Sequence, residues 1–333
     1  LARQGDLAAA RDALDEFLAR TSQRDGGGFA TAVDILRTAE DHAGAVALVD
    51  SARTILGDRA FLARPRALSL LALERPEEAA REAAADLRTS PFNLQLLRRD
   101  LLAEDAPPLP PAFGDALLDL AGSPTAGPAV PILAANVALD RGQAEAAREL
   151  VEPLLGRVDA ARAALHNTGT LARELPLLES AAAQQAVVDY LVAILPTLAE
   201  HPRLGPRLHR RALEHLAETC VQALEHDRLG DQPAAAADRF GELLALVRAG
   251  HPESAELYAA QIALARYERD RLRRPLRAAE RLEKMLLDLD LAVQDKPDKG
   301  RGAAAVGAAD KAQPEQESAT QASPTEIPGT QEG

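Results

Sequence analysis

Residues 139–155 read LDRGQAEAARELVEPLL, and this stretch indicates how the chain folds. A turn at Gly142 breaks the preceding helical pattern, and the apolar residues that follow recur at helical spacing. These residues are Ala147, Val151 and Leu154. Most of the intervening positions hold alanine, glutamate, arginine or leucine, which favour helix. The stretch is therefore typical of a turn followed by the second helix of a helical hairpin.

The same pattern recurs through the first half of the chain. A small or apolar residue opens the second helix of each candidate hairpin, and another apolar residue follows four positions later. The pairs are Ala10 with Leu14, Ala45 with Val49, Ala79 with Ala83, Phe113 with Leu117, and Ala147 with Val151. Successive openers are therefore separated by an almost constant step. Such a step indicates a repeated unit that buries its apolar face against its neighbours.

Two further features keep the same register. A turn lies five residues before each opener, at Gly5-Asp6, Glu40-Asp41, Glu74-Arg75-Pro76, Pro107-Pro108 and Gly142-Gln143. Three residues beyond each second apolar position lie Phe17, Ala52, Asp86, Leu120 and Leu154. All of these residues except Asp86 are apolar, so the same helical face is predicted to be buried in every unit.

A step of about 34 residues, with alanine followed by an aromatic or aliphatic residue four positions later, resembles the tetratricopeptide repeat. The early tryptophan of that family is absent, and its repeat-ending proline appears clearly only as Pro91. The resemblance covers residues 1–160, where the first unit lacks most of its first helix. It implies an all-α fold, a right-handed α-solenoid of helical hairpins.

Beyond residue 160 the register slips, and we interpret residues 161–293 as degenerate helical repeats with longer helices. Long helices are predicted over residues 208–227, 254–270 and 275–293, the last as a cap of the stack. Residues 171–199 fit either two short helices or one long helix. From residue 294 to residue 333 the composition is rich in Ala, Gln, Glu, Ser, Thr and Pro, which predicts a disordered tail.

Composition excludes several classes of function. The 38 Lys and Arg residues against 51 Asp and Glu give a net charge of −13, which disfavours binding to nucleic acid. The single cysteine, Cys220, excludes an internal disulfide framework and a Cys-based zinc site, and its neighbours predict a buried helical thiol. The longest uncharged stretch near the middle of the chain, Tyr190 to Ala199, is too short to cross a bilayer, so we expect a soluble chain without a transmembrane segment.

No motif predicts catalysis, a metal or a cofactor. His215 and His226 lie about three turns apart on one predicted helix, a spacing unlike that of metal ligands, and we interpret them as a solvated face. The glycine run at residues 26–28 lacks the lysine and hydroxyl residue of a phosphate-binding loop and is interpreted as an inter-repeat loop. No Gly-x-Ser-x-Gly is present. The chain is therefore predicted not to be an enzyme and to bind no cofactor.

The resemblance implies that the first helix of each hairpin lines a concave surface on which the family typically binds peptides. Its groove positions fall on Arg64 and Arg98, with Asp34 and Asn136 at a second register. Arginine forks and an amide suit carboxylate oxygens, so a clamp for the terminal carboxylate of a peptide is predicted at Arg64, Arg98 and Asn136. The arginine-rich stretch from Arg266 to Arg281 is interpreted as a solvated helical face rather than as a docking patch.

The sequence thus predicts a non-enzymatic scaffold that binds a protein or peptide segment in the groove. A second hypothesis is a helical accessory region of a longer enzyme or signalling protein whose active domain precedes Leu1, because the first repeat is incomplete. No compartment or oligomeric state follows from the sequence, although the cytoplasm is favoured over the periplasm or the envelope.

Overall fold

The computed structural model describes residues 26–58, 60–102, 106–174 and 180–294, together with Ala9, Asp12 and Glu16. The described residues form α-helices, two short 3₁₀ turns and connecting loops, and contain no strand. The helices are α2 (Gly26–Thr38), α3 (His42–Leu56), α4 (Ala63–Ala72), α5 (Pro76–Thr89), α6 (Leu94–Leu101), α7 (Pro111–Ala121), α8 (Ala129–Asp140), α9 (Ala144–Val151), α10 (Val158–Glu174), α11 (Ala181–Ala199), α12 (Gly205–Glu225), α13 (Pro233–Gly250), α14 (Ala255–Asp270) and α15 (Pro275–Gln294). The 3₁₀ turns are η2 (Pro91–Asn93) and η3 (Glu152–Leu154). The prediction of an all-helical chain is confirmed for these residues.

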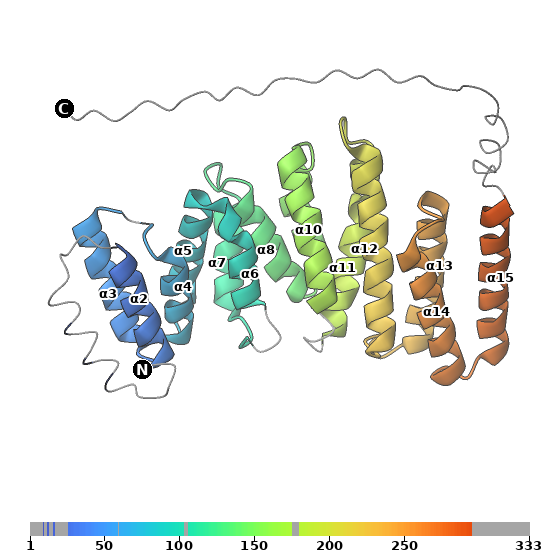
Figure 1. Cartoon of the computed structure of the whole chain (residues 1–333), viewed down its shortest axis with the longest axis horizontal. Helices are drawn as coiled ribbons and strands as arrows, with labels where there is room; N and C mark the ends of the chain where they lie inside the picture. The colour runs from blue at the N-terminus through green and yellow to red at the C-terminus, as the bar shows by residue number, and fades with distance from the viewer. Residues whose placement is uncertain are drawn as a thin grey trace, which may run out of the picture. The chain divides into compact units, whose positions relative to one another are not determined.

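Many helices contact the next helix along the chain, and several contact the helix two places further on (Figure 1). One set of such contacts joins α2 with α4, α6 with α8, α8 with α10, α10 with α12, and α12 with α14. Another joins α5 with α7 and α9 with α11. The chain divides into two compact units, Leu1–Leu286 and Leu287–Gly333, so α2 to α14 lie in the first unit.

Local chemistry explains where many of the helices begin and end. The carboxylate of Asp41 accepts a hydrogen bond from the backbone N–H of Gly44 at 2.9 Å and caps α3. Gly57 ends the same helix in the left-handed conformation, with φ of 71°. Ser180 and Ser254 cap α11 and α14 in the way that Asp41 caps α3. Proline occupies the first turn of α5, α7, α12 and α13, where its missing N–H costs nothing.

The predicted openers and their apolar partners are buried wherever the structure describes them, whereas Leu120 and Leu154, from the set three residues further on, are half-buried. The openers from residue 45 onward and the residues four positions later are at most 1% exposed: Ala45, Val49, Ala79, Ala83, Phe113, Leu117, Ala147 and Val151. The polar exception, Asp86, is 8% exposed, and both of its carboxylate oxygens accept hydrogen bonds from Asn93 Nδ2 at 3.1 Å. The carboxylate of Asp86 is therefore hydrogen-bonded inside the fold. The first unit around Ala10 and the tail from residue 295 lie outside the described residues.

The structure decides three predictions about helices. The glycine run at residues 26–28 is wrong as a loop, because α2 begins at Gly26. Residues 171–174 belong to α10 and residues 181–199 to α11, so the described parts of this stretch lie in two helices. The long helices predicted near residues 208, 254 and 275 are confirmed as α12, α14 and α15.

Helix α11 is the one helix of the described residues that is long and apolar enough to cross a membrane. The uncharged stretch from Tyr190 to Ala199 continues upstream past Asp189 to Ala181, so the apolar helix is longer than that stretch alone. Within the fold, 56% of this segment is buried, as in the core helix of a globular protein. Length and composition alone therefore do not make α11 a membrane span.

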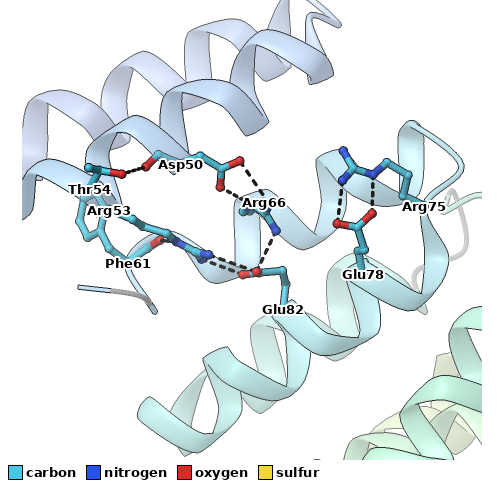
Figure 2. Close-up of polar contacts among 8 residues, drawn as sticks. All are labelled: Asp50, Arg53, Thr54, Phe61, Arg66, Arg75, Glu78 and Glu82. Carbon is cyan, nitrogen blue, oxygen red and sulfur yellow. Dashed lines mark hydrogen bonds and ion pairs between the residues drawn. The ribbon is translucent and has the colours of Figure 1, made fainter. Parts of the chain in front are cut away.

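A network of ion pairs joins α3, α4 and α5 (Figure 2). Both oxygens of Glu82 on α5 accept hydrogen bonds from Arg53 on α3, at 3.1 and 2.7 Å. Arg66 on α4 donates to Glu82 at 2.8 Å and to Asp50 at 2.9 Å, while Arg53 also donates to the carbonyl oxygen of Phe61 at 2.8 Å. The network fixes the position of one hairpin against the next, because each of its arginines contacts residues of two segments.

Candidate functional site: a basic cluster on helices α6, α10 and α12

The four residues predicted to bind a partner fall into separate surroundings. Arg64 on α4 donates through Nε to Asp100 at 2.7 Å, and its side chain is 29% exposed. Asp34 on α2 is exposed. Burial lowers the pKa of neighbouring Arg37, the carboxylates of Asp34 and Asp100 raise it, and the charge of Arg64 lowers it. Asp34 and Arg64 therefore share one surface region, in which the Arg64 side chain is already ion-paired with Asp100.

The other two predicted residues are buried. Arg98 on α6 is 3% exposed, and Asn136 on α8 is 1% exposed. Asn136 Nδ2 donates to the carbonyl oxygen of Ile132 at 2.9 Å, one turn earlier in its own helix. In this arrangement a peptide carboxylate reaches neither side chain directly. The carboxylate clamp formed by Arg64, Arg98 and Asn136 stays a prediction, and the structure does not place the three residues in one group.

Arg98 instead belongs to a basic cluster centred on His166, a residue that the sequence did not single out. Burial lowers the pKa of His166, and the charges of Arg98, His215, Arg173 and Arg211 lower it further. These five side chains, which we call the basic cluster, come from three helices: Arg98 from α6, His166 and Arg173 from α10, and Arg211 and His215 from α12. His166 is the exposed centre, and Arg98 lies beneath the surface.

Carboxylates on α12 hold two of these arginines in place. Glu218 accepts a hydrogen bond from Arg173 Nη2 at 2.9 Å and shares one with His215 Nδ1 at 2.9 Å. Burial raises the pKa of Glu218, but these two hydrogen bonds outweigh it and leave the pKa below its ordinary value. Glu218 therefore carries its charge at neutral pH and orients both neighbours.

A second carboxylate, Glu214, has the same role and lies about one turn earlier on α12. It accepts from Arg211 Nη1 at 2.6 Å and lies 3.3 Å from His251 Nε2. About half of each of these arginines faces solvent, since the side chains of Arg173 and Arg211 are 50% and 49% exposed. Both guanidinium groups can therefore donate further hydrogen bonds to a ligand while they keep their carboxylate partners.

The prediction that His215 belongs to a solvated face is wrong. His215 is 2% exposed, whereas His226 is exposed as predicted. The ring of His215 packs against Gly169 on α10, where an added Cβ atom would lie closer than 3.0 Å to the ring. The absence of a side chain at residue 169 lets α10 and α12 approach closely enough to gather the cluster.

A sequence signal for His166 did exist. Arg64, Arg98, Ile132 and His166 follow one another at the same step as the hairpin openers, and the structure places them on α4, α6, α8 and α10. The register therefore continues one unit past residue 160. Arg211 and His215 on α12 do not follow this step, because the spacing from α10 to α12 departs from it.

The arginine-rich stretch between Arg266 and Arg281 is mostly ion-paired within the chain. Arg274 contacts Asp238 at 3.1 Å, and Arg281 donates through Nε to Glu268 at 3.0 Å, a carboxylate with no solvent exposure. Arg277 also contacts Asp238. These arginines attach the first turns of α15 to α13 and α14. The arginines of the expected solvated face thus join helices through ion pairs. The basic cluster is therefore the stronger candidate for ligand binding.

Among the residues that the structure describes, no three His, Cys, Asp or Glu side chains gather in a geometry suited to a metal ion. The basic cluster offers hydrogen-bond donors and positive charge, a combination that suits carboxylate or phosphate oxygens. Comparison of the chain with family models, with curated proteins and with solved structures finds no match.

Proposed function

We propose that this chain is a non-enzymatic interaction scaffold, a right-handed α-solenoid of tetratricopeptide-like hairpins that binds an acidic segment of a partner protein. The observation that carries the proposal is the group of exposed donors His166, Arg173 and Arg211 on α10 and α12, with the buried Arg98 of α6 beside them. The contacts of α2 with α4, α6 with α8 and α8 with α10 support the stack, because stacked hairpins bring their first helices into contact.

The charge pattern supports an acidic partner. The chain as a whole carries a net charge of −13, whereas in this group three arginines, Arg98, Arg173 and Arg211, outnumber the two carboxylates Glu214 and Glu218. Cations from separate helices can contact successive carboxylates of an extended or helical segment. Arg173 and Arg211 are already oriented by Glu218 and Glu214, so binding orders them at a smaller entropy cost.

The proposal is tested by fluorescence polarisation with labelled peptides and the full chain. The probes are a peptide rich in Asp and Glu and a matched peptide in which Asn and Gln replace them. We expect binding of the acidic probe only, weakening as salt is added, because the contacts are between exposed charges.

Arg173→Gln combined with Arg211→Gln should weaken binding of the acidic probe by about tenfold or more. Arg81→Gln is the matched control, since Arg81 is exposed on α5 and lies away from the cluster. Arg98 is unsuitable for this test because it is buried, so its replacement would disturb folding as well as binding. Equal binding of both probes, or unchanged affinity in the double variant, would refute the proposal.

A further inference from the structure

One aromatic side chain projects fully into solvent at the junction of α5 and α6. Phe92, in η2, is 93% exposed. Among the other aromatic residues that the structure describes, Phe61 and Tyr258 are half-buried. The remainder are core residues that are at most 7% exposed: Phe29, Phe113, Tyr190, Phe240 and Tyr267. An exposed aromatic ring in such a chain is a candidate contact residue, because aromatic anchors dominate protein interfaces.

The turn that carries Phe92 is held firmly. Asn93 donates through Nδ2 to both oxygens of Asp86 at 3.1 Å, and its backbone N–H donates to the carbonyl oxygen of Ser90 at 2.9 Å. Ser90 in turn donates its backbone N–H to the carbonyl oxygen of Asp86 at 2.7 Å, and Pro91 restricts the turn further. Phe92 is therefore presented by an ordered backbone, which reduces the entropy cost of inserting it into a partner.

A pocket that could receive such a ring lies one repeat further along. It has a volume of about 350 Å³ and is formed by the α7–α8 connection together with α9 and η3. Ala126, Pro131, Leu150 and Leu154 provide apolar lining. Ala126 lies one repeat step after Phe92, so it is the equivalent residue of the next connection. It carries a methyl group where Phe92 carries an aromatic ring.

The two regions have complementary charge. Of the three arginines between Leu87 and Arg99, Arg98 is buried and Arg99 lies 3.5 Å from the carboxylate of Asp100, so Arg88 supplies the positive charge beside Phe92. The pocket lining contains one carboxylate, Glu149, and one arginine, Arg157. Arg88 beside the Phe92 turn and Glu149 in the pocket lining are both exposed, and neither has an ion pair among the described residues. Arg88 and Glu149 therefore give the two regions one complementary pair of charges.

The α5–α6 and α7–α8 connections lie at the same end of their helices (Figure 1). A two-fold axis between two copies of the chain can therefore exchange the contacts, each copy supplying one ring and one pocket. We propose that two copies of this chain associate through this edge, with Phe92 of each copy inserted into the α7–α8 pocket of the other and Arg88 facing Glu149. The dimer does not depend on the proposed scaffold function.

Sedimentation velocity of the full chain over a range of concentrations tests the proposal. We expect a reversible dimer whose Kd rises at least about tenfold in Phe92→Ala. Leu246→Ala is the matched control, because Leu246 is 44% exposed on α13 and should leave the Kd unchanged. A monomer at every concentration, or a dimer indifferent to Phe92→Ala, would overturn the proposal.

A charge exchange separates the proposed contact from unrelated loss of structure. Arg88→Glu alone and Glu149→Arg alone should each weaken the dimer, because each places like charges opposite one another. The chain that carries both substitutions should recover dimerisation, since every contact again joins opposite charges. Circular dichroism verifies that each variant is folded, and failure of the double variant to recover would also overturn the proposal.

Discussion

The imidazole ring of His215 on α12 lies directly over the backbone of Gly169 on α10. A Cβ atom at residue 169 would come within 3.0 Å of ring atoms of His215, well inside van der Waals contact. His215 is buried and joined to Glu218 by a hydrogen bond of 2.9 Å, so the ring has little room to move aside. This contact sets the separation of the two helices that supply most of the basic cluster.

Gly169→Ala should therefore destabilise the protein, although alanine is the better helix former. Overpacking of the α10–α12 contact is expected to cost about 1–3 kcal/mol of unfolding free energy. The measurement is chemical denaturation followed by circular dichroism. Gly122→Ala is the control, because an added methyl group there meets only the backbone oxygen of Asp119 at 3.6 Å, an ordinary van der Waals contact, and should be tolerated. Stability equal to or above wild type in Gly169→Ala would contradict the described contact.

The His166 imidazole should titrate below its ordinary pKa of 6.5, because burial and the positive charges of neighbouring arginines disfavour its protonated form. The unfolded chain then binds more protons than the native chain near that pH, so the contribution of His166 to stability is lost as pH falls through about 6.5. NMR titration of the histidine ring resonances measures the pKa directly. Arg211→Gln should raise it and Arg81→Gln should not, whereas equal effects of the two variants would be inconsistent with the cluster.

Glu82→Ala should lower stability by about 1–3 kcal/mol, because it removes a carboxylate that two largely enclosed arginines share. The side chains of Arg53, Arg66 and Glu82 are 13%, 12% and 14% exposed. The exposed pair of Arg75 with Glu78, drawn in the same figure, supplies the control (Figure 2). Glu78→Ala should have no measurable effect in the same denaturation experiment. Similar losses in both variants would show that the network does not join the hairpins.

Cys220 should be unreactive in the native protein. The thiol is fully buried, and burial raises its pKa to about 12, so almost no thiolate forms near neutral pH. Reaction with a chromogenic disulfide reagent is expected to be very slow under native conditions and complete after unfolding in guanidinium chloride. Rapid reaction of the native chain would show that α12 opens locally or that the thiol is accessible.

Much of the fold was predictable because the signals are local. Gly142 and Pro76 mark turns through backbone chemistry that needs no tertiary context, and Ala79 and Phe113 lie in the core because helical spacing aligns them with other apolar residues. The glycine run at residues 26–28 misled the prediction, since helix packing can override the weak helix preference of glycine.

The sequence by itself determined the helical class, the regular hairpin register and the buried face of each described hairpin. Periodicity within a helix fixes these features, because it decides which side chains share a side. Only the tertiary structure decided that His166 lies among Arg98, Arg173 and Arg211, that His215 is buried, and that Phe92 is exposed. Those outcomes depend on which helix faces meet and how closely, and close approach at a residue such as Gly169 is a property of two helices rather than of one.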